Sequence, residues 1–322
     1  MSENDKKCCA AGFRTSIGGP ALIEGIMMRG PEKTAMAVRN KEGEIIVEDV
    51  LDSRDKKMPK FLRLPIIRGL FNFVQTMLLG YKAIMRSAEL SGLDDDEGEE
   101  MSKFERFLTE KLGEKLFSII GAIAMVLGVV LAVALFVLVP TGLVKLFNTY
   151  VFDLKGFTAV AEGLIKIGVF IAYIALVRLM PDIKRTFEYH GAEHKTIACY
   201  EAGEAITVEN AREHSRFHPR CGTSFILIVL IVSIVLFLAV PSQWGVLLRF
   251  ALRILLLPLV VGVGYEIIKF VGKHDNKFTR IISAPGLWLQ KLTTCEPDDS
   301  QLEVAIESLL AVMPEDKNEA EW

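Results

Sequence analysis

Long apolar runs alternate with short polar stretches along the chain, and the lengths of these runs predict the main architecture. The four strongest runs occupy residues 116–139, 157–180, 224–240 and 245–271. A helix needs about 20 mainly apolar residues to cross the hydrocarbon core of a bilayer. The pattern therefore predicts about four transmembrane helices. Pro140 would end the first and Pro181 the second, because proline lacks the N–H that continues a helix.

Charged residues inside the second and fourth runs predict a contact between them. Glu162 lies near the start of the second run, and Arg249 and Arg253 lie near the start of the fourth. An unpaired charge at the centre of the bilayer costs roughly 3 kcal/mol or more. We therefore predict an ion pair between Glu162 and Arg253, while Arg249 snorkels to the headgroups.

The distribution of basic residues predicts the orientation. Residues 181–223 contain six lysines and arginines, whereas residues 241–244 contain none. Short loops rich in Lys and Arg remain in the cytosol. With an even number of spans, this bias places both termini and residues 181–223 on the cytosolic side of a multi-pass cell-membrane protein.

The N-terminal segment, residues 1–60, predicts a small cytosolic layer that contains β-structure. Glycine and proline punctuate residues 17–31. Two short apolar-rich runs at residues 34–38 and 44–50 flank the turn-forming sequence Asn-Lys-Glu-Gly, which indicates a β-hairpin.

Residues 61–115 combine an amphipathic helix with an acidic linker. Apolar side chains recur at helical spacing through residues 65–88, but the uncharged stretch is too short to span a bilayer. This helix either lies on the bilayer surface or packs on the β-hairpin layer. Contiguous acids then form a linker at residues 92–103.

Residues 181–223, between the second and third runs, predict a helical hairpin. Residues 184–201 have the composition of a helix, which Gly203 would end. Thr207 can cap a second helix, and Pro219 limits its extent. The hairpin would return residues 218–221 toward the first helix.

The last segment, residues 272–322, predicts one amphipathic helix after Gln301 and a frayed acidic end, as a cytosolic tail. The fold expected is mainly α. It consists of the N-terminal layer at residues 1–60, the segment 61–115, spans within residues 116–180 and 224–271, the helical hairpin at 181–223 and this tail.

Composition agrees with a membrane protein and narrows the possible partners. Hydrophobic residues make up 51% of the 322 residues, and the mean hydropathy is +0.35, which is too high for an ordinary soluble chain. The net charge is −3 and no polybasic block occurs, so we expect the lipid bilayer as a partner and no nucleic acid. The five cysteines show no paired framework, as is typical of a reducing compartment.

Four of the five histidines lie within 29 residues, and two of them form an HxxEH motif. On a helix, His190 and His194 project from one face and can bind one metal ion. Glu193 stands beside them and could take a proton from a water molecule that the metal activates. Chance matches to so short a motif are not rare, but a second His/Cys cluster nearby favours metal binding, with zinc the preferred ion.

That second cluster supplies candidates for the remaining ligands. His218 and Cys221 lie in the sequence His-Pro-Arg-Cys, and His214 is a weaker candidate. Four protein ligands would make a closed structural site, whereas three and a water would make a catalytic one. Arg220 could stabilise an oxyanion or a phosphate, or could serve only as an anchor at the membrane interface.

Three motifs in this order, IGGPALIEGIMMRGP, EYHGAEHKTIACYE and HPRCGTSF, resemble those of the bacterial YqhQ-like family, over about residues 16 to 295. The resemblance implies a membrane protein of unknown function that is described as a predicted metal-dependent enzyme. The motif residues are Glu24, Met28, Arg29, His190, Glu193, His194, Lys195, His218, Arg220 and Cys221.

The function expected is that of a zinc-dependent membrane hydrolase, with Glu193 and Arg220 as catalytic residues and a membrane-protein, peptide or lipid-linked substrate. A non-catalytic assembly or scaffolding factor with a structural metal is the alternative. A transporter is less favoured, because four spans are few and no repeat of them is visible.

Overall fold

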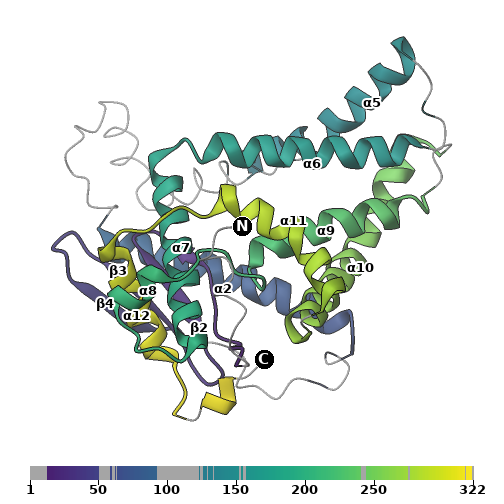
Figure 1. Ribbon diagram of the computed structural model, residues 1–322. Helices are drawn as coiled ribbons and strands as arrows, with labels where there is room; N and C mark the ends of the chain where they lie inside the picture. Colours follow the sequence, from purple (N-terminus) through teal and green to yellow (C-terminus); the bar gives the residue numbers. More distant parts are fainter. Residues whose placement is uncertain are drawn as a thin grey trace, which may run out of the picture.

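The computed structural model describes residues 13–50, 64–92, 134–151, 157–240, 244–274, 276–315 and 317–320, together with 59, 62, 123, 126–128, 130–132 and 154. Figure 1 shows a layer built on a small sheet at one end of the molecule, from which a group of apolar helices extends. The predicted acidic linker lies outside the described residues except for Gly92, as do residues 116–122 of the first apolar run.

The sheet is an antiparallel meander of four strands. In the order β1-β2-β3-β4 these are Ala21–Leu22, Gly25–Arg29, Thr34–Arg39 and Ile45–Asp49. The β3–β4 pair confirms the predicted hairpin, and its turn contains Gly43 with a φ of 86°, a conformation that favours glycine. Strands β1 and β2 lie in the segment that glycine and proline punctuate, for which no individual strand was predicted.

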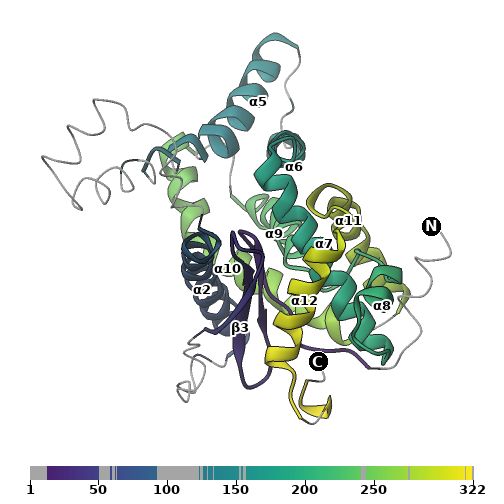
Figure 2. The ribbon, with the colours of Figure 1, turned by 90° about the vertical axis from the view of Figure 1, so that its left-hand side faces the viewer.

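Both faces of the sheet are covered, as Figure 2 shows with the sheet seen almost edge-on. On one face, Leu22 and Met27 pack with Leu79 of helix α2 (Ile67–Ser91). On the other face, Ile26 and Met28 join a core with α7 (Pro181–Ala202) and α12 (Asp299–Val312). Alternate side chains of β2 therefore serve two different cores.

Helix α2 packs on the β-layer, which was one of its two predicted positions. Its N-terminal half also contacts α10 (Val246–Lys273), where Arg68 forms an ion pair with Glu266 and Asn72 donates to Tyr265. A stripe of apolar residues remains exposed along it, comprising Ile67, Val74, Met77, Leu78, Tyr81, Ile84 and Met85. We still predict, without a test, that this exposed stripe lies at the bilayer surface.

Within the described residues, three helices are long and apolar enough to cross a membrane, namely Val126–Tyr150, Thr158–Val177 and Leu248–Lys273. The third predicted span, residues 224–240, differs from the expectation. Its helix α9 is Gly222–Phe237, with 16 residues, and falls short of the usual length. Four spans are thus not established by helix length alone.

The end predicted for the first span at Pro140 is wrong. Helix α5 (Val139–Tyr150) contains Pro140 in its first turn, and the π-helix Ala134–Leu138 precedes it directly. A proline in a helix leaves a carbonyl one turn earlier without its donor, and a local widening of the helix accommodates this. Pro181, by contrast, separates α6 (Thr158–Val177) from α7 as predicted.

The predicted ion pair between the second and fourth apolar runs is confirmed. Both carboxylate oxygens of Glu162 on α6 accept from the guanidinium of Arg253 on α10, at 2.9 and 2.6 Å. Thr141 of α5 also donates to Glu162. This contact joins three apolar helices at the end away from the sheet layer (Figure 1).

The helices after residue 180 surround the histidines. α7 is followed by α8 (Val208–Glu213), which Thr207 caps as predicted. After α9 and α10 comes α11 (Lys277–Thr293), which the sequence pattern did not predict. Helix α12 forms where expected, but it is not a tail. Leu302, Ala305 and Leu309 are buried against α7 and the sheet, and the 3₁₀ turn Lys317–Ala320 follows.

Candidate metal centre

His190, His194 and Cys221 converge at the junction of the sheet layer and the apolar helices. Their donor atoms all lie within 4.8 Å of one another. The two histidines are one turn apart on α7, whose middle is buried on all sides. Cys221, which directly precedes α9, is the third member of the cluster. His194 is 2% exposed and Cys221 5% exposed, whereas His190 is half-buried, so the cluster is largely enclosed by protein and is accessible at His190.

Backbone carbonyls hold both imidazoles in one tautomer. His190 Nδ1 lies 2.9 Å from the Thr293 carbonyl, and His194 Nδ1 lies 2.6 Å from the Arg216 carbonyl. A carbonyl oxygen only accepts, so each Nδ1 carries a proton, and each Nε2 is the nitrogen that offers a lone pair when its ring is neutral. His190 Nε2 faces Cys221 Sγ at 3.1 Å. Imidazoles that bind metals are commonly oriented in this way by a partner on the other nitrogen.

The surroundings of Cys221 favour its thiolate. Burial opposes ionisation, but the nearby positive charges of His190 and His194 hold the pKa of Cys221 well below its ordinary value. Conversely, burial disfavours the charged form of His190, yet the Cys221 thiolate raises the pKa of His190 to about 9. Cys221 also caps the N-terminus of α9 by accepting from the Thr223 amide. The thiolate is the form that binds metals.

Glu193 is buried beside the cluster with half of its carboxylate unpaired. Its Oε1 accepts from the Gly19 amide at 3.0 Å, whereas Oε2 is buried and has no hydrogen-bond partner among the described residues. Burial raises the pKa of Glu193, and the charges of His194 and His190 act against that rise. A buried oxygen without a partner is costly, so this position favours a proton or a bound ligand.

His218 lies next to the cluster but does not join its three donors. Its ring centroid is 5.5 Å from that of His194. The Gln290 side chain holds the His218 main chain through two hydrogen bonds, of 2.8 and 2.7 Å. Its Nε2 faces Arg220 at 3.2 Å and Glu201 at 3.8 Å, and burial lowers the pKa of His218. The geometry thus brings Cys221, rather than His218, to the two histidines of α7. Ligation by His218 remains a prediction.

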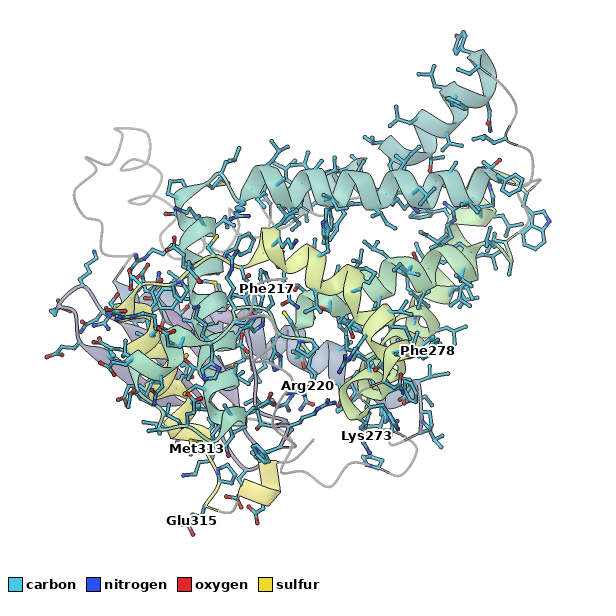
Figure 3. All side chains as sticks on the ribbon, in the orientation of Figure 1. Phe217, Arg220, Lys273, Phe278, Met313 and Glu315 are labelled. Atoms are coloured by element: carbon cyan, nitrogen blue, oxygen red, sulfur yellow. The ribbon has the colours of Figure 1, made fainter. Side chains whose placement is uncertain are left out.

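Arg220 forms a buried ion pair with Glu201 of α7, and its side chain is 6% exposed. Glu201 also accepts from the Thr15 amide at 2.7 Å. Burial opposes ionisation of Glu201, but His218 and Arg220 bring its pKa below the ordinary value. Figure 3 shows Arg220 in the middle of the molecule, between α7 and the apolar helices. Both an oxyanion role and an anchoring role for Arg220 remain predictions.

Gly191 allows α7 to lie directly against the connection between α11 and α12. A Cβ atom at Gly191 would stand 2.1 Å from the Cys295 carbonyl oxygen. The Cys295 amide donates to the Phe187 carbonyl at 2.8 Å. This close approach is what brings the Thr293 carbonyl within reach of His190.

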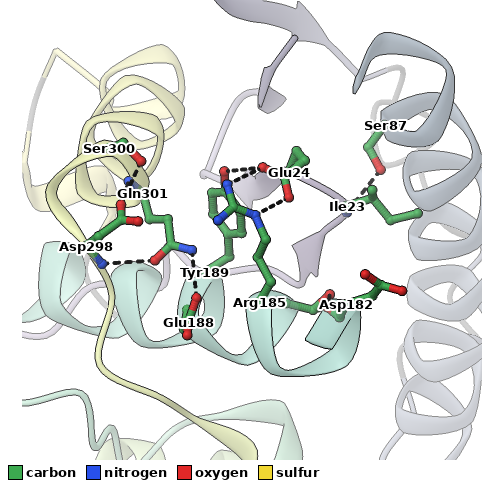
Figure 4. A network of polar contacts seen from close by, with 11 residues as sticks. Ile23, Glu24, Ser87, Asp182, Arg185, Glu188, Tyr189, Asp298, Ser300 and Gln301 are labelled. Atoms are coloured by element: carbon green, nitrogen blue, oxygen red, sulfur yellow. Dashed lines mark hydrogen bonds and ion pairs between the residues drawn. The ribbon is translucent and has the colours of Figure 1, made fainter. Parts of the chain in front are cut away.

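A second polar network fastens the sheet to the start of α7 (Figure 4). The carboxylate of Glu24 accepts from the Arg185 guanidinium on both oxygens, and the Tyr189 hydroxyl donates to it at 3.2 Å. Glu24 has a φ of 50°, which is uncommon for a residue other than glycine. The burial of Tyr189 and the charge of Glu24 raise the pKa of Tyr189. This network sets the position of α7 relative to the sheet.

The groups that orient the predicted ligands were not predicted from the sequence. The carbonyls of Thr293 and Arg216 hold the imidazoles, and Gln290 and Glu201 hold the segment that carries His218 and Arg220. Main-chain carbonyls have no signature in the sequence. Glu201 was visible only as an acid in the same motif as the histidines.

The donor set fits zinc. It combines two imidazole nitrogens, each of which can bind a metal once its ring gives up the second proton, a cysteine that favours its thiolate, and carbonyls that orient both rings. The chain is therefore a mainly helical protein with helices suited to a membrane and a buried centre of two histidines and one cysteine.

Comparison with known proteins gives the family. The chain belongs to the family described as protein of unknown function (DUF1385), whose pattern matches residues 64–315. It is similar to the uncharacterized protein YqhQ of Bacillus subtilis (strain 168), with 37% identity over 296 residues and 91% coverage of both chains. The resemblance found in the three sequence motifs is thus confirmed. No solved structure matches the chain.

Proposed function

We propose that this protein is a zinc-dependent hydrolase that acts at the cytosolic face of the cell membrane on a peptide or lipid-linked substrate. The observation that carries the proposal is the arrangement of three convergent donors beside a buried carboxylate oxygen that has no partner among the described residues. Three protein ligands leave a zinc ion one open position, which is the hallmark of catalytic rather than structural sites.

Each residue has a role in this proposal. His190, His194 and Cys221 would hold the ion. When bound, zinc acts as a Lewis acid that polarises a carbonyl or phosphoryl oxygen and acidifies water. Glu193 would accept a proton at Oε2, because its other oxygen is occupied by the Gly19 amide. The burial that raises the pKa of Glu193 also suits it to give that proton to a leaving group.

A non-catalytic assembly or scaffolding factor is the second candidate. The burial of the cluster favours it, because a metal enclosed by protein commonly serves to hold a fold together. In that case the metal would join α7 to the start of α9, and Glu193 would serve only to hold the segment around Gly19.

Zinc content and turnover separate the two candidates. We expect Glu193→Gln to keep the zinc content of the parent protein but to lose hydrolysis of peptides and lipids from native membrane extracts, as followed by mass spectrometry. His194→Ala should lose the zinc and destabilise the protein. His274→Ala, which alters a histidine outside the cluster, is the control. Parent protein that carries zinc but releases no product with any extract would favour the scaffold.

The packing also supports four membrane crossings. The sheet, α7, α8 and α12 pack together, so they lie on one side of the bilayer. Between α8 and α12 the chain contains α9, α10 and α11. Helix α11 carries Lys277, Arg280 and Lys291 and is not among the helices apolar enough to cross, so the chain returns to the same side only if α9 and α10 both cross. We infer that α9 spans despite its 16 residues, helped by the apolar turn that follows it and by local thinning of the bilayer.

A further inference from the structure

A second group of metal-binding side chains lies outside the candidate centre. Donor atoms of Cys199, Glu204 and His214 all lie within 4.8 Å of one another. Cys199 is in the last turn of α7, Glu204 is in the connection to α8, and His214 directly follows α8. Three elements that are adjacent in the chain thus direct one donor each to a common point.

The contacts within this group bring its donor atoms close together. His214 Nε2 lies 3.1 Å from a Glu204 carboxylate oxygen. The Cys199 thiol lies 3.5 Å from the Ala205 carbonyl and also contacts the Thr207 main chain, and burial and the charge of Glu204 raise its pKa to about 11. The His214 side chain is 8% exposed, whereas that of Glu204 is 47% exposed. An ion could therefore enter from the Glu204 side and meet donors that are already held in place.

We propose that Cys199, Glu204 and His214 form a second site for a divalent transition metal such as zinc, separate from the His190–His194–Cys221 cluster. Sulfur, nitrogen and carboxylate oxygen are the three donor types that zinc accepts in proteins. An ion pair between Glu204 and His214 would not by itself require a cysteine sulfur at the same point.

The position of this site gives it a structural task. Helix α8 has only six residues, and a helix so short is not stable by its own hydrogen bonds. A metal would tie both ends of the α8 segment to α7. His214 is two residues before Arg216, whose carbonyl orients His194. The second metal would thus brace the segment that carries Arg216 and Cys221 into the first cluster.

Metal stoichiometry tests the proposal. Full-length protein in detergent is stripped with a chelator and titrated with Zn²⁺, and with Co²⁺ to detect thiolate ligation by absorption. We expect the parent to bind two equivalents. His214→Gln, Cys199→Ser and Glu204→Gln should each lose one equivalent and keep the other. Glu209→Gln, which changes an exposed carboxylate on α8, is the matched control and should still bind two.

The result stays distinct from the test of the proposed function. If the first cluster binds no metal, His194→Ala will leave the stoichiometry unchanged, whereas His214→Gln will still lower it. The second equivalent should also slow amide hydrogen exchange in residues 204–216 of the parent but not of Glu204→Gln, whose exposed position keeps the fold intact. A parent that binds the same number of equivalents as all three variants would overturn the second site.

Discussion

Single residues decide how closely the parts of the candidate centre approach one another. Gly191 lies against the Cys295 carbonyl, and Glu24 links the sheet to α7 through Arg185 and Tyr189. Neither residue would bind a metal itself. Both set the position of α7, which carries the two histidines, so their effects should appear in stability and in metal content together.

Gly191→Ala should destabilise the protein and reduce its zinc content. The new Cβ would overlap the Cys295 carbonyl oxygen, so α7 or the connection after α11 must move. Overpacking of this kind costs about 2–3 kcal/mol. Gly222→Ala is the control, because a Cβ there meets nothing within 4 Å. Thermal unfolding in detergent and zinc analysis would check both variants. Equal stability and zinc content in the two would show that the close approach is unimportant.

Glu24→Gln should lower the free energy of unfolding by about 1–2 kcal/mol, because hydrogen bonds between charged groups are lost but Arg185 is partly exposed. Glu44→Gln, at an exposed turn of the same sheet, should have almost no effect. Chemical denaturation of the two variants gives the comparison. A loss no greater for Glu24→Gln than for Glu44→Gln would mean that the network contributes nothing to stability.

At the scale of elements, the apolar helices are specified by a few polar contacts. Glu162 and Arg253 join α6 to α10, and Arg68 and Glu266 join α2 to α10. In an apolar surrounding, a charged side chain strongly prefers an arrangement that provides a partner. Such pairs therefore select which faces of the helices meet.

The Glu162–Arg253 pair should show coupling in a double-mutant cycle. We expect Glu162→Gln and Arg253→Gln to interact by about 1 kcal/mol or more in detergent stability, because either change leaves the other charge buried without its partner. The pair Glu162→Gln and Arg249→Gln is the control and should be nearly additive. Additive effects in the first cycle would refute a stabilising role for the contact.

At the scale of the whole molecule, the β-layer forms around both ends of the described chain. Strands near the N-terminus pack with α7 and with α12 near the C-terminus, and the apolar helices lie between them in sequence. The layer is complete only after the last apolar helix has been made. We therefore expect the candidate centre to form late in folding.

This arrangement predicts which residues share a side of the membrane. Ala205→Cys and Glu315→Cys should both be protected from a membrane-impermeant maleimide in intact cells and should react after permeabilisation. Trp244→Cys should react in intact cells, because Trp244 is exposed and lies directly before α10. The parent protein is the blank. Labelling of Ala205→Cys and Trp244→Cys from the same side would overturn both the orientation and the four crossings.

Local sequence patterns determined much of the fold. The apolar runs predicted the long helices, the Asn-Lys-Glu-Gly turn predicted the β3–β4 hairpin, and Thr207 and Gly203 marked helix ends. The spacing of His190 and His194 placed both on one face of a helix. All of these depend on residues within a few positions of one another, where periodicity and capping act directly.

The tertiary structure alone decided how those parts combine. Only packing shows that α12 is part of the core, that α11 supplies the Thr293 carbonyl to His190, and that Cys221 rather than His218 faces the histidines. These contacts join residues 31 to 103 positions apart, or involve main-chain atoms that every residue type shares. Their formation depends on the packing of whole helices, which no local pattern of residues encodes.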